Sequence, residues 1–345
     1  MTRALASVLL LGLLPMLLFA SISARADVVM GWAAASGTIL VAHDGKIEAF
    51  DRSGGRMLWS AKGLATPSAM VVSADGKGAA ILDAFADRVA LFSVAGGPVR
   101  FHDTPNTPVA AAFFGHDLWV VLRDRSRVRR ITEEGAETDV AVALDPALIA
   151  VSDKFVYVYS RADGLLQEID PQSAQVTRSV QTGIAGSDLE IRVTGREAPR
   201  GEPSGGSAYL CLPNGKIEVI RLALMESGQI RLGASPIDLA LVPPNDSLPW
   251  TEGTALIADP GKPALHTATD LRRTTPIRTP TPVDRITITS TGAFAFDSNS
   301  GTLYRVHEKT LTAVASGLTA TSFVVTKNGV FRWDGDGGRV TLVDG

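Results

Sequence analysis

A repeat of about 40 residues is the feature that most constrains the fold of this chain. Each unit reads as a strand, a tight turn, a second strand, a polar turn and a third strand, as in PSAMVVSADGKGAAILDAFADRVALFSVAGG at 67–97. Successive third strands lie 42, 39, 38, 51, 48, 38 and 37 residues apart. This period is typical of a β-propeller, in which small sheets bury their faces against each other around an axis. The apolar anchors of the third strands are Ile47, Val89, Val128, Leu166, Ile217, Leu265, Leu303 and Val340.

We therefore predict an all-β fold, a β-propeller of about eight four-stranded blades. Seven blades are the alternative, because the unit around Leu265 has the weakest pattern. The segments 118–122, 155–160 and 293–298 are rich in aromatic and β-branched residues, which suit buried strands. The last unit, 319–345, lacks a recognisable outermost strand, and DVVMG at 27–31 could supply it by strand exchange.

The first 26 residues have the features of a secretory signal peptide. Arg3 gives a positive start, Leu9 to Ala20 are apolar, and Ala24-Arg25-Ala26 offers small residues for cleavage before Asp27. An uncleaved membrane anchor is the alternative, although the apolar run is short for a spanning helix. We expect an exported protein, periplasmic or secreted, with residues 27–345 forming a single β-propeller domain and no membrane span after signal removal.

Charge and cysteine content narrow the classes of partner. The formal net charge is −3, which gives no general attraction for nucleic acid. Cys211 is the one cysteine, so the chain has no internal disulfide and depends on a packed core. Cys211 lies in the apolar segment SAYLCLP without an adjacent basic residue, which indicates a buried structural thiol rather than a nucleophile.

GKIEAFDRSGGRMLW at 45–59 resembles the repeat of pyrroloquinoline-quinone-type propellers, and Gly45, Ala49, Phe50, Asp51, Gly55 and Trp59 match it. Segments 80–97 and 294–310 are similar to the looser exported propellers of the YVTN type. The resemblance implies a propeller fold. The quinone-dependent dehydrogenases carry an adjacent cysteine pair and a calcium site, and a chain with one cysteine cannot form that pair. We therefore do not carry their activity over.

Metal sites have little support in the sequence. DSNSG at 297–301 and DGDGG at 334–338 place oxygen side chains two residues apart, as calcium loops do, but neither continues to a bidentate Glu. Turns stabilised by an Asp side chain are the preferred interpretation, with calcium as the alternative. The five histidines lack metal-ligand spacing, and we expect ordinary surface histidines. We predict no catalytic residue, no metal ligand and no cofactor.

RDRSRVRR at 123–130 is the strongest local concentration of positive charge. Arg125, Arg127 and Arg129 could form a patch that binds phosphate, an anionic glycan or an acidic partner. The alternative is a solvated hairpin neutralised by Asp124, Glu133 and Glu134.

Two long repeat intervals come from insertions at 194–207 and 243–253, both between the first and second strands of their units. Equivalent loops of adjacent blades emerge on one face, so we expect these two loops to form a raised rim. Trp250 is an aromatic residue of the kind enriched in binding hot spots. Asp246, Glu252, Arg196 and Arg200 could surround it in a partner-binding site. Two unrelated surface insertions are the alternative.

Three functional hypotheses follow. The first is a non-catalytic binding platform for a protein or cell-envelope partner. The second is a propeller enzyme, cofactor- or metal-dependent as in quinoproteins or lactonases, with its site at the central channel. Three or more carboxylates, amides or histidines converging in that channel would favour it. The third is a companion subunit in a redox complex. The sequence leaves the oligomeric state open.

Overall fold

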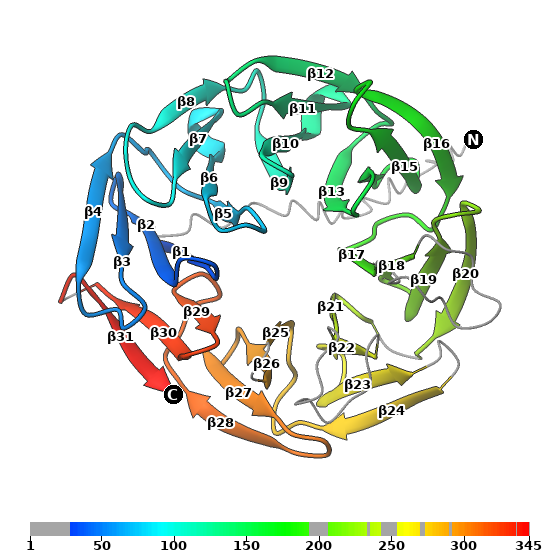
Figure 1. Ribbon diagram of the computed structural model, residues 1–345. Coiled ribbons are helices and arrows are strands. Elements are labelled where there is room, and N and C mark those ends of the chain that lie inside the picture. Colours follow the sequence, from blue (N-terminus) through cyan, green and yellow to red (C-terminus); the bar gives the residue numbers. More distant parts are fainter. Residues whose placement is uncertain are drawn as a thin grey trace, which may run out of the picture.

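The computed structural model describes residues 28–192, 206–232, 235–242, 254–269, 273–289, 292–335 and 337–344. They form a ring of eight antiparallel sheets around one axis, a β-propeller (Figure 1). Seven blades have four strands and blade 8 has three. This confirms the all-β propeller with eight blades and removes the seven-blade alternative. No helix among these residues is long and apolar enough to cross a membrane.

Each blade is a simple meander, with its first strand on the axis and its last strand on the outer wall. Two single-turn 3₁₀ helices, η1 (Ala84–Ala86) and η2 (Arg123–Arg125), follow β6 and β10. The strands of blades 1 to 4 are β1 (Val28–Ala33), β2 (Thr38–His43), β3 (Lys46–Phe50), β4 (Met57–Lys62), β5 (Ala69–Val72), β6 (Gly78–Asp83), β7 (Arg88–Ser93), β8 (Arg100–Asp103), β9 (Pro108–Phe114), β10 (Asp117–Leu122), β11 (Arg127–Ile131), β12 (Glu137–Ala141), β13 (Pro146–Val151), β14 (Val156–Ser160), β15 (Leu165–Asp170) and β16 (Gln175–Gln181). Those of blades 5 to 8 are β17 (Asp188–Arg192), β18 (Ser207–Leu212), β19 (Lys216–Arg221), β20 (Glu226–Arg231), β21 (Asp238–Leu241), β22 (Ala255–Asp259), β23 (Ala264–Thr269), β24 (Arg273–Arg278), β25 (Arg285–Thr289), β26 (Gly292–Asp297), β27 (Thr302–Val306), β28 (Leu311–Ala315), β29 (Phe323–Thr326), β30 (Gly329–Asp334) and β31 (Arg339–Asp344).

The core consists of apolar layers between neighbouring blades. One layer joins Leu40 and Ile47 of blade 1 to Ile81 and Phe92 of blade 2, and similar layers follow around the ring. The second and third strands supply most of these side chains because both of their faces are covered by adjacent blades. All eight anchors from the sequence lie in third strands, which confirms the repeat register.

Antiparallel pairing sends successive connections to alternate sides of the ring. First-to-second and third-to-fourth connections lie on one side. It includes the two long connections after β17 and β21, so we name it the long-loop face. Second-to-third connections, and those that lead to the next blade, lie on the other side. Val28 starts β1 there, so we name it the N-terminal face.

Ring closure differs from the sequence prediction. The segment that includes 28–31 pairs with β2 as the innermost strand of blade 1, so it does not complete blade 8. Its side chains Val28 to Met30 are buried, whereas outermost strands such as β4 and β16 alternate exposed and half-buried residues. Side chains close the seam instead. Phe331 and Val340 pack on blade 1, and the Trp333 and His43 ring centroids lie 4.3 Å apart.

The segment 45–59 forms the β3–β4 hairpin of blade 1. Asp51 accepts the backbone N–H of Ser53 at 3.1 Å and holds the turn. Trp59 packs edge-on against Phe92, and its Nε1 donates to the carbonyl of Val94 at 2.9 Å. The segment 45–59, which carries the clearest copy of the repeat motif, therefore attaches blade 1 to blade 2 through Trp59.

Candidate functional site

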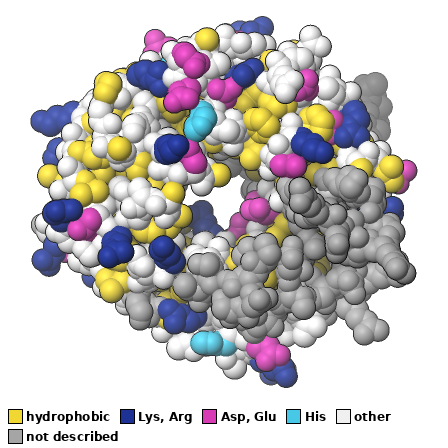
Figure 2. Space-filling view, in the orientation of Figure 1, with side chains coloured by type: hydrophobic (Ala, Val, Ile, Leu, Met, Phe, Trp, Pro, Cys, Tyr) yellow, Lys and Arg dark blue, Asp and Glu magenta, His cyan; other side chains and the backbone are white. Residues whose placement is uncertain are grey.

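The inner strands of blades 5 and 6 bring three carboxylates to the central channel. Asp188 and Glu190 lie on β17, and Asp238 starts β21. All three side chains are partly exposed. The described residues of the other inner strands, β1, β5, β9, β13, β25 and β29, include no Asp or Glu, so among the inner strands acidic residues occur on the side of blades 5 and 6. Figure 2 shows an opening at the axis with acidic side chains at its edge, on the side of β17 and β21.

Two of these carboxylates join neighbouring blades. Asp188 Oδ2 accepts the backbone N–H of Leu239 on β21 at 2.8 Å. Asp238 Oδ2 accepts the N–H of Ile286 on β25 at 2.5 Å. The Glu190 carboxylate has no hydrogen bond or ion pair to another residue that the structure describes. Glu190 is therefore the member of the group with free hydrogen-bonding capacity.

The surroundings of the three groups favour their neutral forms. Burial, followed by the charges of Asp188 and Asp238, raises the pKa of Glu190 to about 8. Burial and the charge of Asp188 raise the pKa of Asp238 to about 8, although Ile286 N–H opposes the change. Burial also raises the pKa of Asp188. In the described part of the chain, no three His, Cys, Asp or Glu side chains are grouped so that they could hold a metal ion. The arrangement can therefore hold protons or bind a hydrogen-bonding ligand.

These pKa values predict a pH-dependent stability. The folded protein keeps protons on Glu190 and Asp238 up to about pH 8, whereas an unfolded chain releases them near about pH 4. The folded state binds more protons in that window, so the contribution of these groups to stability falls as the pH rises. The Glu190→Gln/Asp238→Asn variant cannot ionise there. We expect its Tm to exceed that of the wild type by about 2–4 °C at pH 9 and to match it at pH 4.

Thermal unfolding followed by circular dichroism at both pH values measures this effect. Glu226→Gln, on the exposed outer strand β20 of blade 5, is the control for neutralising a carboxylate outside the channel. Parallel Tm–pH curves for the wild type and the channel variant would contradict the prediction.

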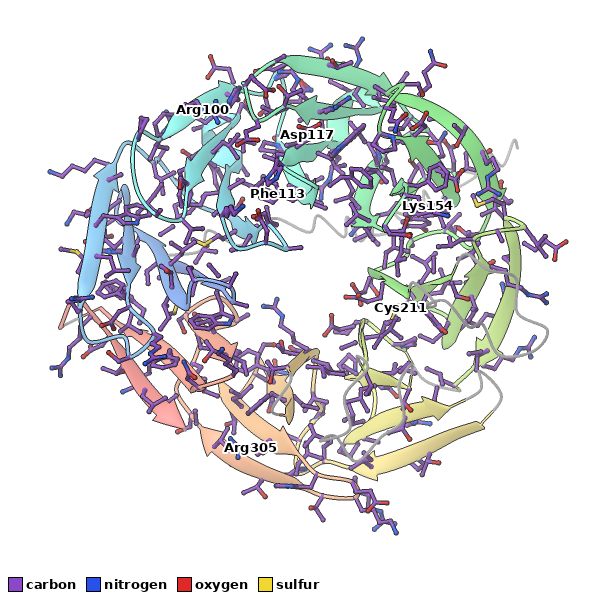
Figure 3. The ribbon with its side chains drawn as sticks, viewed as in Figure 1. Arg100, Phe113, Asp117, Lys154, Cys211 and Arg305 are labelled. Atoms are coloured by element: carbon purple, nitrogen blue, oxygen red, sulfur yellow. The ribbon has the colours of Figure 1, made fainter. Side chains whose placement is uncertain are left out.

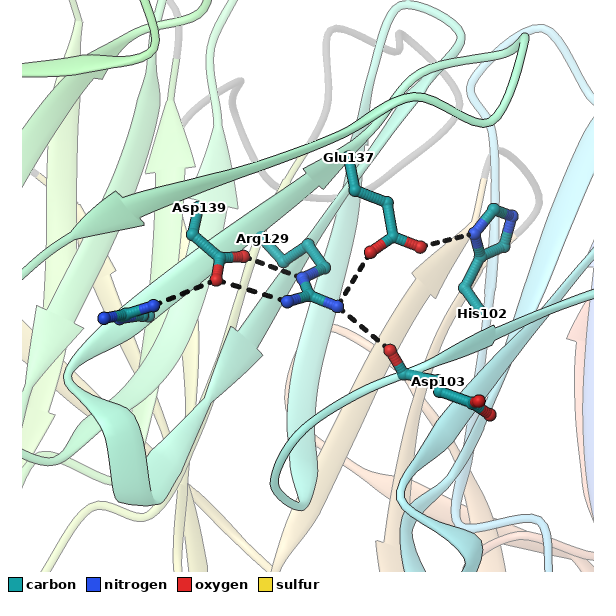
Figure 4. A network of polar contacts seen from close by, with 6 residues as sticks. His102, Asp103, Arg129, Glu137 and Asp139 are labelled. Atoms are coloured by element: carbon teal, nitrogen blue, oxygen red, sulfur yellow. Dashed lines mark hydrogen bonds and ion pairs between the residues drawn. The ribbon is translucent and has the colours of Figure 1, made fainter.

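The arginine run forms an internal ion-pair network on the outer wall (Figure 4). Arg129 binds both carboxylate oxygens of Asp139, contacts Glu137 at 2.8 Å and donates to the carbonyl of Asp103 at 2.9 Å. Arg127 also contacts Asp139, at 3.2 Å. Through Glu137 the network reaches His102 on β8, which ties blade 3 to blade 2.

Arg125 lies apart on η2, and its Nε donates to Asn106 Oδ1 at 3.0 Å. The three arginines proposed as an anion patch therefore do not form one open surface. The hydrogen bonds and ion pairs of these arginines favour the alternative interpretation, a hairpin whose positive charges are neutralised by nearby acids. The acids that pair with Arg127 and Arg129 are Asp139 and Glu137 of the paired strand β12, which were not among the Asp124, Glu133 and Glu134 named from the sequence.

The proposed partner-binding residues Trp250, Asp246, Glu252, Arg196 and Arg200 lie outside the described residues. The strands that flank them are described. The first long connection joins β17 to β18 and the second joins β21 to β22, so both link first to second strands in adjacent blades. Their topological placement agrees with the sequence prediction.

The candidate calcium loops contain turn-stabilising aspartates. Asp297 Oδ1 accepts the backbone N–H of Asn299 at 2.9 Å, and its Oδ2 accepts the Ser300 hydroxyl at 2.6 Å. Asp334 Oδ1 accepts the N–H of Gly337 at 3.3 Å. These bonds use the carboxylates as the hairpin-turn interpretation predicts.

Three of the five histidines are buried, contrary to the prediction of surface histidines, whereas Cys211 is buried as predicted. His43, His102 and His266 are buried, so the prediction of surface histidines is wrong for these three. His43 and His102 pair with Glu48 and Glu137, which explains how blade contacts accommodate them. Cys211 is fully buried on β18, one strand behind the channel, and burial raises the pKa of its thiol (Figure 3). The reading of Cys211 as a buried thiol is confirmed.

Sequence reasoning missed the channel carboxylates. A local signal was present, because both inner strands begin with Asp-Leu, at 188–189 and 238–239. An acidic residue at the start of an inner strand marks a polar position on the channel wall, because the inner strands of blades 1 to 4 contain no charged residue.

No protein-family model matches this sequence, and no curated protein matches it. Solved structures do match. The dihydro-heme d1 dehydrogenase NirN, in complex with DHE, aligns with a TM-score of 0.63 and 14% identity over 83% of this chain and 65% of that chain. A catalytically inactive virginiamycin B lyase from Staphylococcus aureus with quinupristin aligns with a TM-score of 0.58 and 11% identity over 79% of this chain and 92% of that chain.

Kuenenia stuttgartiensis hydrazine synthase aligns with a TM-score of 0.55 and 12% identity, covering 85% of this chain and 95% of that chain. At these identities the likeness shows the β-propeller fold alone. Other matching structures come from a mitotic checkpoint complex and from BBS1N in complex with ARL6DN, so the fold occurs both in enzymes and in protein assemblies.

Proposed function

We propose that this chain is an exported, non-catalytic binding platform for a protein or cell-envelope partner, and that the partner binds on the long-loop face. The observation that carries the proposal is the position of the two long connections. Both connect strand ends on the same face of blades 5 and 6, the two blades whose inner strands carry Asp188, Glu190 and Asp238. A rigid ring whose two longest connections join strands of adjacent blades on one face offers a broad surface at low entropic cost.

Within that surface, Trp250 is the proposed anchor, with Asp246, Glu252, Arg196 and Arg200 around it. An aromatic side chain surrounded by charges of both signs suits a partner with an apolar centre and a polar rim. The partial likeness of 45–59 to quinone-type repeats supports an exported setting for the platform and adds no cofactor to it.

Affinity capture from an envelope fraction tests the proposal. The tagged wild type, a variant lacking residues 196–205 and Trp250→Ala serve as baits, with identification of the proteins and glycans that co-elute. We expect both changes to reduce recovery of a specific partner at least about tenfold, the loss typical of a hot-spot residue. Trp59→Phe is the control, because Trp59 lies in the seam between blades 1 and 2. Unchanged recovery with both variants would remove the proposal.

A channel enzyme is the second candidate, favoured by the convergence of Asp188, Glu190 and Asp238. A carboxyl group that is protonated near pH 7 and free of other hydrogen bonds is suited to act as a general acid. Incubation of a metabolite extract with the wild type and with Glu190→Gln, followed by mass spectrometry, tests it. A compound consumed by the wild type alone would establish the enzyme, and identical extracts would exclude it.

A further inference from the structure

The most exposed large apolar side chains gather on the N-terminal face. Eight large hydrophobic residues are exposed in the described part of the chain. The three most exposed are Phe85, Leu144 and Ile184, at 61%, 60% and 63%. Phe85 lies on η1 between β6 and β7, whereas Leu144 and Ile184 lie in connections that lead into the next blade. All three connections belong to the N-terminal face, and the long-loop face carries Leu224 in the β19–β20 turn.

Leu144 and Ile184 flank one turn, the β14–β15 turn of blade 4. The backbone N–H of Leu144 donates to Asp163 Oδ2 in that turn, at 2.8 Å. A Cβ built on Gly164, in the same turn, would lie 3.0 Å from Ile184 Cγ2. The two apolar side chains therefore form a pair, one on each side of a fixed hairpin.

The backbone holds these side chains outward. Arg161 N–H donates to the carbonyl of Asp145 at 2.9 Å, and Thr182 N–H donates to the carbonyl of Gly164 at 2.7 Å. At blade 2, Thr104 N–H donates to the carbonyl of Asp87, directly after η1, at 2.6 Å. The apolar residues thus project from connections that are hydrogen-bonded to the ring, and burying them requires an external apolar phase.

The N-terminal face is also where the preceding chain joins the ring. Val28 starts β1 there, and residues 1–27, with the apolar run from Leu9 to Ala20, come directly before it. The run is the predicted signal peptide, so this face is the one next to the bilayer while the chain is still joined to that peptide during export. Charged residues of both signs lie on the same face, including Asp87, Arg125 and Lys262, which gives no preference for an anionic surface.

We propose that the N-terminal face rests on a lipid bilayer, with Phe85, Leu144 and Ile184 inserted at the headgroup boundary. The tips are spread from blade 2 to the junction of blades 4 and 5, with polar residues between them. This spacing suits a fluid lipid surface, which accepts separate apolar side chains, better than a protein hot spot, which requires one continuous patch. The long-loop face then points away from the membrane.

A site-specific fluorophore tests the orientation directly. Cys211 is fully buried, so a cysteine added at the surface can be labelled selectively. Leu144→Cys, Ile184→Cys and the control Leu224→Cys, all in the chain without residues 1–26, are labelled with an environment-sensitive dye and mixed with phosphatidylcholine vesicles. We expect a blue shift and a rise in emission at 144 and 184 and no change at 224. Equal responses at the three positions, or no response at 144 and 184, would overturn the proposal.

Vesicle co-sedimentation gives the second measurement. We expect Phe85→Ser/Leu144→Ser/Ile184→Ser to reduce partitioning about tenfold or more, because each change removes several buried CH₂-equivalents. Met57→Ser/Leu224→Ser should partition like the wild type. Every protein is prepared without residues 1–26, the predicted signal peptide, so that its apolar run does not itself bind the vesicles. Partitioning of the triple variant equal to that of the wild type would overturn the proposal. A dye response that appears only when a protein fraction is added, and not with vesicles alone, would also overturn it.

Discussion

Gly301→Ala is expected to destabilise the ring by roughly 3 kcal/mol, far beyond the effect of most surface substitutions. Gly301 ends the β26–β27 turn at φ +65°, a region that side chains disfavour. A Cβ there would lie 2.7 Å from the carbonyl oxygen and 3.1 Å from the nitrogen of Leu318. Those atoms belong to the connection between blades 7 and 8, which must move to make room.

Movement of Leu318 would disturb two interactions. Its N–H donates to the Gly301 carbonyl at 3.0 Å, and its side chain is buried in the layer with Phe296 and Val330. Left-handed strain of about 1–2 kcal/mol and the weakened hydrogen bond of about 1 kcal/mol together give the expected loss. Urea unfolding monitored by circular dichroism measures it.

Gly317→Ala is the matched control. Gly317 has φ +69° and lies in the same connection, but a Cβ there would meet no atom within 4 Å. Its cost should be the strain alone, about 1–2 kcal/mol. If the two variants unfold at the same urea concentration, the close approach of residue 301 to Leu318 does not contribute to the loss of stability in Gly301→Ala.

The blades could be predicted from the sequence because each is local. Ile47, Val89 and the later anchors recur at the third strand, since every blade has to bury that strand on both faces. The closing seam could not be predicted in this way. It depends on contacts such as that of Trp333 with His43, between opposite ends of the chain, and a repeat pattern carries no information about that pair.

The candidate site also has one part that the sequence predicts and one part that it does not. The length and topological place of the two long connections follow from the spacing of anchors. The channel group does not, because Asp188 and Asp238 are far apart in sequence and meet through the register of two blades. The acids that pair with Arg129 were not predicted for a related reason. Arg129 pairs with a residue directly opposite on the next strand, Asp139, and not with acids that are close along the chain.

The two faces support different roles. The hydrogen-bonded connections of the N-terminal face carry isolated apolar tips, while the long connections join strand ends on the other face, in the blades that carry the channel carboxylates. A platform on a membrane would thus keep its partner-binding loops accessible, and one variant on each face can test the two roles separately.

Arg178→Met is expected to lower the free energy of unfolding by about 3–5 kcal/mol at pH 7, because it leaves a buried carboxylate without its counter-ion. The Glu168 side chain is 1% exposed, and Glu168 on β15 lies directly opposite Arg178 on β16. Arg178 Nε donates to its Oε1 at 2.8 Å, and Arg178 Nη2 contacts its Oε2. Arg178 also donates to the carbonyl of Ala223 at 2.8 Å, which joins blade 4 to blade 5.

Two other groups hold the Glu168 carboxylate. The Thr177 hydroxyl donates to Oε1 at 2.8 Å, and the Tyr157 hydroxyl donates to Oε2 at 3.1 Å. Burial raises the pKa of Glu168, but the hydrogen bonds and charge of Arg178 and the bond from Thr177 outweigh it, so the pKa lies below its usual value. The group therefore stabilises the fold above the unfolded pKa, near about 4, and this contribution is lost as the pH falls through the folded value.

The pH dependence of the variant separates loss of charge pairing from loss of packing. Without Arg178, burial should raise the pKa of Glu168, and protonation should relieve the unpaired charge, so the destabilisation should shrink between pH 7 and pH 4. Arg178→Met/Glu168→Gln should recover part of the loss at pH 7 for the same reason. Arg231→Met, an exposed arginine on the outer strand β20, should change stability by less than about 0.5 kcal/mol. A deficit that is equal at both pH values and unchanged in the double variant would show that Arg178 acts by packing and by its bond to Ala223, and not by compensating the buried charge.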